Sequence, residues 1–159
     1  MKLADFKKQP RGPYQFDWFL HRDTIDSPLG TFAVELTVAM GKQPDQAMVD
    51  AMEILIGKFE KNKSAIAQMV FKEYLTIARS EPDWLAGCEV PPNLLVDGLA
   101  PYLEARALTV SDDRALTVSD EVDNADDRYH PRVYMSPSWD EEHGFYLKFD
   151  GDQIERVDC

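Results

Sequence analysis

The feature that most limits how this chain can fold is a change of hydrophobic period at Gly41. Before it, over residues 31–38, apolar side chains alternate with polar ones, the pattern of a strand with one covered face. After it, over residues 44–77, apolar side chains recur every three or four positions, as on an amphipathic helix. The two patterns in succession predict a sheet packed against helices.

Two strands are expected before Gly41, over residues 14–20 and 31–38, with turn residues at 27–30 between them. They are expected to pair as antiparallel neighbours. In the first strand the face predicted to be covered carries Tyr14, Phe16, Trp18 and Leu20. In the second, one face carries Phe32, Val34, Leu36 and Val38, and the other carries Thr31, Glu35 and Thr37.

Helices are expected from Pro44, which suits a first helical position, to Glu81, which precedes a proline. The polar residues 61–64 are expected to divide this stretch into two helices. After them, a loop is expected to carry Trp84 and Cys88. A third, shorter helix is predicted from Asn93 onward, kinked or stopped by Pro101.

The remainder of the chain again shows strand patterns. Apolar alternation over residues 133–135 and 145–149, with a turn at 150–151 and a last run at 154–157, predicts a closing antiparallel meander. The chain of 159 residues, 44% of them hydrophobic, suffices for one domain spanning 1–159. The fold class predicted is therefore α+β, a largely antiparallel sheet with two or three helices packed on one face.

A tandem duplication interrupts this pattern, because residues 106–112 recur letter for letter at 114–120. Two copies are too few for a solenoid, so we interpret them as a duplication within one strand and its following loop. Because the offset of eight is even, sliding the strand by one copy keeps every side chain on its original face. One copy is therefore expected to be dispensable for folding.

The charge is strongly acidic, with a formal net charge of -12. Residues 106–159 hold 14 of the 29 acidic residues but 6 of the 17 basic ones, and the segment 112–132 is expected to be a mobile acidic loop. Nucleic acids are excluded as partners, because binding them relies on lysine and arginine displacing counterions. A basic protein is the partner that this charge favours.

The cysteines and the hydropathy pattern favour a reducing cellular compartment, in which the thiols stay reduced. Cys88 and Cys159 form neither a disulfide framework nor a paired thiolate site. The first residues lack the apolar core of a signal peptide, and no stretch reaches membrane-spanning length. We therefore expect a cytoplasmic protein without membrane association.

No catalytic, metal or cofactor signature is complete in this sequence. His21, His130 and His143 are dispersed, are expected in loops, and lack the spacing of a zinc site. Glycine-rich phosphate loops and a serine nucleophile elbow are absent too. We predict no cofactor, no bound metal and no catalytic residue.

One late motif is distinctive, Trp139-Asp140-Glu141-Glu142-His143-Gly144, which lies between two strand patterns. With the strand and the turn that follow it, and with the earlier residues 25–32, it resembles an uncharacterised bacterial domain family that ends in W-D-x-E-H-G. The resemblance extends over residues 24–158 and implies a small cytoplasmic α+β domain without an assigned reaction. Several similar domains occur as immunity proteins beside secreted bacterial toxins.

The leading hypothesis is a non-enzymatic acidic binding protein, an immunity protein that neutralises a cytosol-acting toxin by masking its active site. Its expected partner is a cognate toxin domain. Two alternatives stay open: a small metal-dependent hydrolase using Glu142 and His143, and a housekeeping scaffold. The residues expected to bind the partner are Asp123, Asp126, Asp127, Trp139, Asp140, Glu141, Glu142, His143 and Tyr146.

Overall fold

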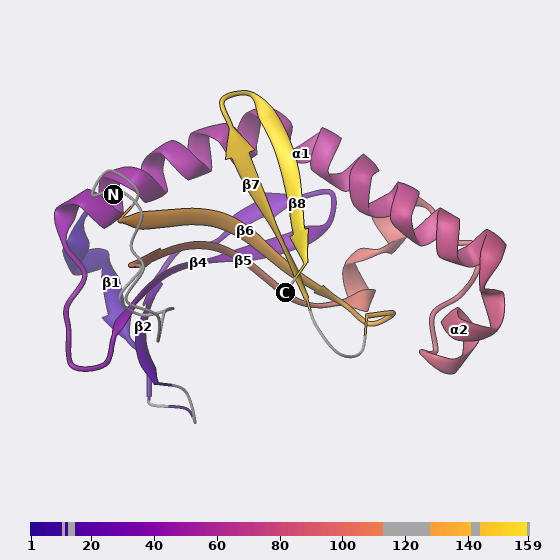
Figure 1. Cartoon of the computed structure of the whole chain (residues 1–159), viewed down its shortest axis with the longest axis horizontal. Coiled ribbons are helices and arrows are strands. Elements are labelled where there is room, and N and C mark those ends of the chain that lie inside the picture. Colours follow the sequence, from indigo (N-terminus) through magenta and orange to yellow (C-terminus); the bar gives the residue numbers. More distant parts are fainter. Residues whose placement is uncertain (11, 13–14, 113–127, 141–143, 159) are drawn as a thin grey trace.

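The computed structural model describes residues 1–10, 12, 15–112, 128–140 and 144–158, and within them one long helix runs across a mostly antiparallel sheet (Figure 1). The helices are α1 (Gln46–Ser80) and α2 (Pro82–Gly87). The strands are β1 (Phe6–Lys8), β2 (Phe16–His21), β3 (Ile25–Ser27), β4 (Gly30–Ala39), β5 (Leu103–Asp112), β6 (Tyr129–Pro137), β7 (Phe145–Asp150) and β8 (Gln153–Asp158).

The strands lie in the order β1-β2-β4-β5-β6-β7-β8, and β3 pairs with β4 beside this path. The expected antiparallel pairing of the first two predicted strands is confirmed, with Phe19 opposite Leu36. The closing meander β6-β7-β8 is confirmed as well. One pair, β4 and β5, is parallel, because the chain returns through α1 before it enters β5. The α+β class and the largely antiparallel sheet thus match the prediction.

The predicted break in the helical region is wrong, because α1 is one continuous helix of 35 residues. Asp45 is its N-cap and accepts a hydrogen bond from the Met48 amide at 3.1 Å. Residues 61–64 contain no glycine or proline, so nothing in the backbone requires an end there. Asn62 instead donates to the Lys58 carbonyl at 2.8 Å, and Lys63 pairs with Glu60. These polar side chains mark the outer side of a helix rather than a boundary.

The segment after α1 also differs from the prediction. Trp84 lies in the short helix α2, which begins at Pro82, rather than in a loop. The third helix expected from Asn93 is absent from this described segment, which forms two 3-10 turns, η2 (Val96–Gly98) and η3 (Ala100–Tyr102). Pro101 explains the difference, since a proline inside an α-helix removes a hydrogen bond and clashes with the preceding turn.

The hydrophobic core lies between α1 and one face of the sheet. Phe59 of α1 packs on Phe32 of β4 with ring centroids 4.9 Å apart, and both side chains are fully buried. Each such side chain contributes about 1.5–3 kcal/mol through removal from water. We call the sheet face under α1 the core face and the opposite one the open face.

The face of β2 that was predicted to be covered is the wrong one. Phe19 is 5% exposed and points into the core, whereas Phe16, Trp18 and Leu20 are only partly buried on the open face. The core face of β2 also holds Asp17, whose carboxylate accepts from Lys8 at 2.7 Å and from the Gly41 amide at 2.9 Å. A buried carboxylate is tolerated when such donors compensate its desolvation.

The first and last residues of the predicted acidic loop at 112–132 belong to strands instead. Asp112 belongs to β5 and is 8% exposed, and residues 129–132 belong to β6. The first copy of the duplication forms β5, whereas residues 113–127, with the second copy, lie outside the described residues. No helix in the described part of the chain is long and apolar enough to cross a membrane.

Candidate functional site

The open face presents ordered rows of side chains across its central strands. One row runs from Trp18 through Thr37 and Ser111 to His130. The next runs from Leu20 through Glu35 and Thr109 to Arg132, and a third joins Ala33, Ala107, Tyr134 and Tyr146. Residues paired across neighbouring strands share a face, so these rows follow directly from the register. Hydroxyl groups therefore occupy the middle of the open face and aromatic rings its flanks.

A cavity of about 410 Å³ lies between these flanks, and we call it the open-face cavity. Its volume falls in the range of pockets that hold small ligands or side chains of a partner. Thr37 and Ser111 are 8% and 6% exposed, although no helix covers them in the described part of the chain. The residues that line the cavity are Phe16, Trp18, Glu35, Thr37, Thr109, Ser111, Tyr134 and Tyr146.

Among the described residues that line this cavity, Glu35 is the one acidic side chain. Burial raises the pKa of its carboxyl group above the ordinary value. Its carboxylate makes no hydrogen bond or ion pair within the described part of the chain. Its neighbours in the row, Leu20 and Thr109, are not ionisable. The cavity therefore holds a desolvated negative charge that the described residues do not neutralise.

Arg132 provides a second unsatisfied group beside the cavity. Its guanidinium lies over the Tyr146 ring at 5.0 Å from the centroid. Its Nε is buried and has no hydrogen-bond partner in the described structure. Buried polar atoms nearly always have a partner, so this Nε is open to an acceptor from solvent or from a ligand.

The late motif, by contrast, begins in the core. Trp139 is 2% exposed, and its ring packs on Tyr74 with centroids 5.7 Å apart. Its indole nitrogen donates to Glu73 at 3.3 Å, and its carbonyl accepts from the Trp84 indole at 2.7 Å. The ring is occupied in joining the end of β6 to α1 and α2, and its role as an anchor for a partner stays a prediction.

Two other predicted binding residues, Asp140 and Tyr146, are described and are partly exposed. Tyr146 lies in the wall of the open-face cavity, while Asp140 follows Trp139 and its amide donates to the Pro137 carbonyl at 3.0 Å. The structure thus brings only one of them to the cavity. The remaining predicted residues lie outside the described ones: Asp123, Asp126, Asp127, Glu141, Glu142 and His143.

Gly144, the last residue of the motif, allows a close approach to the cavity wall. A Cβ at this position would lie 2.6 Å from the Met135 carbonyl oxygen and 2.6 Å from atoms of the Tyr134 ring. The glycine therefore sets the position of Tyr134, which packs on Tyr146 with ring centroids 5.1 Å apart. The motif thus contributes to the open face through the packing of Gly144 against Tyr134.

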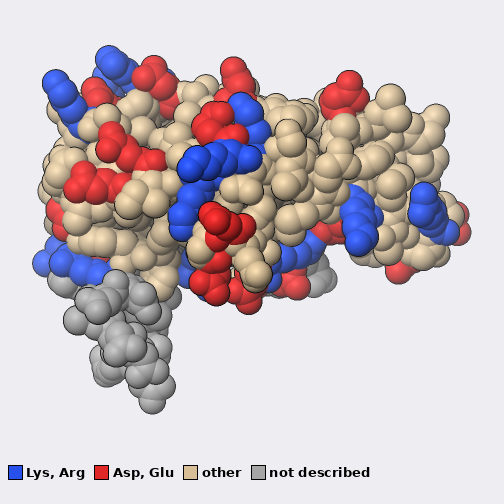
Figure 2. Space-filling model, turned by 90° about the horizontal axis from the view of Figure 1, so that it is seen from above, with Lys and Arg blue, Asp and Glu red and all other residues tan. Residues whose placement is uncertain are grey.

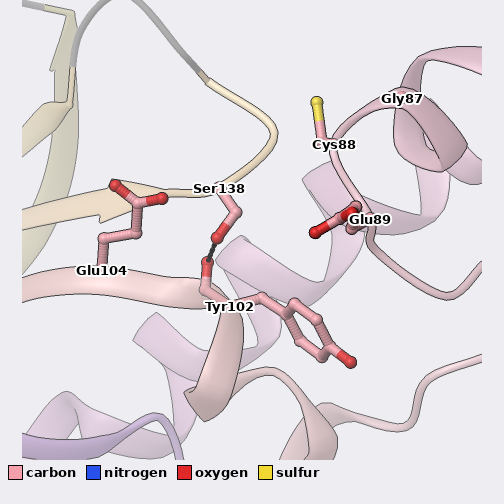
Figure 3. A pocket seen from close by; sticks show the side chains of 6 residues that line it. All are labelled: Gly87, Cys88, Glu89, Tyr102, Glu104 and Ser138. Atoms are coloured by element: carbon pink, nitrogen blue, oxygen red, sulfur yellow. Dashed lines mark hydrogen bonds between the residues drawn. The ribbon is translucent and has the colours of Figure 1, made fainter.

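A second cavity, of about 380 Å³, lies where α2 ends near the start of β5 (Figure 3). Cys88 and Glu89 reach it from the end of α2, Glu104 from β5, and the Ser138 hydroxyl donates to the Tyr102 carbonyl at 3.0 Å. A nucleophilic thiolate is favoured by cationic neighbours, whereas the ionisable groups beside Cys88 here are carboxylates. The lining lacks the electrostatics of a cysteine nucleophile.

The described histidines lie in strands rather than in the loops predicted for them. His21 belongs to β2 and is 8% exposed, and its Nδ1 accepts from the Asp23 amide at 3.0 Å. His130 belongs to β6. Within the described ranges, no three His, Cys, Asp or Glu side chains are grouped to hold a metal ion.

The side of the molecule seen from above carries charges of both signs (Figure 2). Seen from above, acidic and basic side chains are interspersed along its length (Figure 2). Several of them pair, as Arg156 does with Glu73 and Lys63 with Glu60. In the open-face cavity, however, the Glu35 charge has no such counterpart. An external cation would therefore find an unneutralised carboxylate in this cavity.

Comparison with protein-family models, curated proteins and solved structures finds no match to this chain.

Glu35, Trp18 and Tyr134 were not among the predicted site residues, although the sequence carries a signal for them. The expected pairing of the first two strands sets Trp18 and Leu20 on one face together with Thr37 and Glu35. An aromatic residue that shares a face with a carboxylate fits a surface site better than a core. The parallel neighbour β5, which completes the cavity with Thr109 and Ser111, follows only from the tertiary structure.

Proposed function

We propose that this chain is a non-enzymatic binding protein that holds a basic protein partner on the open face of its sheet. The observation that carries this proposal is the open-face cavity, with aromatic walls and the unneutralised carboxylate of Glu35. Aromatic side chains dominate the energy of protein interfaces, and a complementary charge sets specificity. The net charge of -12 adds long-range attraction for a cationic partner.

Within this class we propose an immunity protein that acts in the cytoplasm and masks the active site of a bacterial toxin. Toxins that act on nucleic acids or nucleotide cofactors use lysine and arginine to hold phosphate. An acidic inhibitor pairs with those same side chains and thereby excludes the substrate. Support for this class comes from the acidity of the chain and from the resemblance of its late motif to the uncharacterised bacterial domain family. In that motif, Asp140, Glu141 and Glu142 supply further carboxylates for a basic partner.

The experiment that tests the proposal is co-expression of the chain with toxin domains encoded by neighbouring genes of its native genome, followed by calorimetry and stopped-flow kinetics of the purified pair. We expect rescue of growth, a one-to-one complex, and an association rate that falls steeply with added salt. Binding without any loss of toxin activity would contradict masking. Metal-dependent turnover of a substrate by the chain alone would contradict the non-enzymatic role.

A further inference from the structure

The starting point is a carboxylate and one guanidinium nitrogen, both without a hydrogen-bond partner in the described structure, on one row of the open face. The Glu35 carboxylate is half-buried without a partner, and two strands away the Nε of Arg132 is buried without an acceptor. Desolvating a charge without compensation costs free energy, so the free protein is less stable than it would be with neutral side chains here. A ligand that neutralises Glu35 recovers that cost on binding.

The walls of the cavity limit what this ligand is. Trp18 and Phe16 come from β2, and Tyr134 and Tyr146 from β6 and β7. Aromatic faces attract cations, and tryptophan does so most strongly. The Tyr146 ring already holds the Arg132 guanidinium, so a cation gains from the tryptophan wall as well as from Glu35, whereas an anion would meet the carboxylate and the negative ring face.

The number of acceptors favours a guanidinium over an ammonium group. Beside the carboxylate, the cavity offers the hydroxyl oxygens of Thr37, Thr109 and Ser111. A guanidinium has five N–H donors in one plane, binds a carboxylate through two of them and stacks on aromatic rings. An ammonium group has three donors and no plane to stack.

We propose that the open-face cavity receives one arginine side chain of the basic partner, with Glu35 as its counter-ion and Trp18 as its stacking wall. This inference rests on the proposed function for the identity of the partner as a protein. In the complex, a carbonyl oxygen of the arginine-bearing segment accepts from the Arg132 Nε. The site thus binds the partner's arginine side chain and one carbonyl group of the backbone that carries it.

The test uses the intact chain and a small probe, N-acetylarginine amide, whose ends are uncharged. N-acetylcitrulline amide is the matched control, because it has nearly the same shape and no charge. Binding is measured from changes of the Trp18 indole N–H signal in NMR spectra, with Trp84 and Trp139 as internal references. We expect saturable binding of the arginine probe only, weak in absolute terms because a lone side chain gains little affinity.

Two variants assign the effect to the cavity. Glu35→Gln keeps the shape and is expected to weaken probe binding at least tenfold, as loss of a charge-assisted hydrogen bond does. Glu104→Gln makes the same change in the second cavity and is expected to leave binding unchanged. Trp18→Leu lacks the reporting indole, so its binding is followed from the backbone amide signals of Glu35 and Thr109, and it is expected to be weaker as well. Thermal melts of each variant confirm that it is folded.

Equal binding of both probes, or unchanged arginine binding by the folded Glu35→Gln variant, would overturn the inference. The result is separable from the proposed function. If Glu35→Gln still neutralises the toxin fully and the probes do not bind, the cavity assignment fails and the immunity proposal stands. If the arginine probe binds through Glu35 but no toxin is neutralised, the arginine site stands and the immunity proposal fails.

Discussion

The hydroxyl of Tyr129 donates to the carboxylate of Asp45 at 2.5 Å, which ties the first residue of β6 to the N-cap of α1. Arg128 adds to this contact, since its guanidinium lies 3.2 Å from Asp112 and 4.0 Å from Asp45. Burial and the hydrogen bond to Asp45 raise the pKa of Tyr129 to about 12. The end of β5, the start of β6 and the start of α1 are thereby fixed together.

Replacing Tyr129 by phenylalanine is expected to lower the free energy of unfolding by about 1 kcal/mol, the typical net value of one hydrogen bond. Because the folded-state pKa of Tyr129 is raised, its contribution is complete below the ordinary pKa of tyrosine. It is lost as the pH rises toward about 12. Alkaline titration of tyrosinate absorbance should therefore lose its latest-titrating group in Tyr129→Phe.

Tyr102→Phe serves as the control for that titration, because the Tyr102 hydroxyl makes no hydrogen bond within the described part of the chain. It should leave the late group in place. Loss of that group in Tyr102→Phe, or its persistence in Tyr129→Phe, would show that the contact with Asp45 does not control the titration.

Gly144→Ala is expected to destabilise the protein by about 1–3 kcal/mol, the usual cost of forcing an atom into a packed site. The added methyl would lie 2.6 Å from the Met135 carbonyl oxygen, which is backbone and cannot move away cheaply. It would also push the Tyr134 ring off the wall of the open-face cavity. Urea unfolding measures the first effect, and binding of the arginine probe measures the second.

Gly57→Ala gives the matched comparison for this substitution. Gly57 lies inside α1, and a Cβ there would meet nothing within 4 Å. The same change should stabilise the helix by about 0.5–1 kcal/mol, since glycine loses more backbone freedom than alanine. If both variants shift stability in the same direction, close contact at Gly144 is not the cause.

The strands β2 and β4 and the meander at the end of the chain could be predicted, because period-two alternation depends on each strand alone, whereas β1 and β3, of three residues each, are too short to show it. The continuity of α1 through residues 61–64 could not be predicted. Polar residues at 61–64 fit a linker and the solvent side of a helix equally well, and only packing of Phe59 and Ile66 on one sheet decides between them. Similarly, the face of β2 is decided by its neighbour β4, since both of its faces carry large apolar side chains.

The duplication supports a deletion test, because removing residues 106–113 or 113–120 produces the same polypeptide. The product keeps an arginine at the position of Arg106, which donates to the Leu29 carbonyl at 3.1 Å and to the Thr31 carbonyl at 3.2 Å. It also keeps an aspartate at the position of Asp112. We therefore expect a folded protein whose melting temperature is close to that of the full chain, because shortening a connection by eight residues changes its closure entropy little.

Two seven-residue deletions provide the control for register. Removing residues 114–120 leaves Asp113 after β5, whereas removing 106–112 leaves it before the strand, between Ala105 and Arg114. The second product displaces the arginine by one residue, which turns the following side chains to the other face. It should be less stable than the first by thermal melting. An insoluble or molten product of the eight-residue deletion would show instead that both copies are needed.

The candidate site could be predicted only in part. Tyr146 was found because an aromatic residue on the outer side of a strand is a plain sequence signal. Glu35 was assigned to an outer face with Thr31 and Thr37, but its significance depends on what surrounds it. The nearby Thr109 and Arg132 come from strands more than 70 residues away in sequence. Thr109 lies in β5, the parallel neighbour of β4, and Arg132 lies in β6 beyond it, and no local pattern specifies this parallel pairing.

Glu35→Gln is expected to raise the melting temperature of the free protein at neutral pH. Burial raises the pKa of Glu35, so the folded state holds this proton more tightly than the unfolded state. Folding is then favoured below the ordinary pKa of glutamate, and that advantage is lost as the pH rises through the folded-state value. On this face, the adjacent strands present no ionisable group beside Glu35, and β6 presents His130 and Arg132.

The comparison of wild type and Glu35→Gln across pH separates this cause from a change in packing. The difference in melting temperature should shrink as the pH falls, because a protonated Glu35 resembles glutamine in shape and charge. Glu104→Gln, at an exposed position of β5, should shift the melting temperature little at any pH. A Glu35→Gln variant less stable than wild type at neutral pH would mean that the carboxylate has a stabilising partner, and an arginine would then gain nothing by entering the cavity.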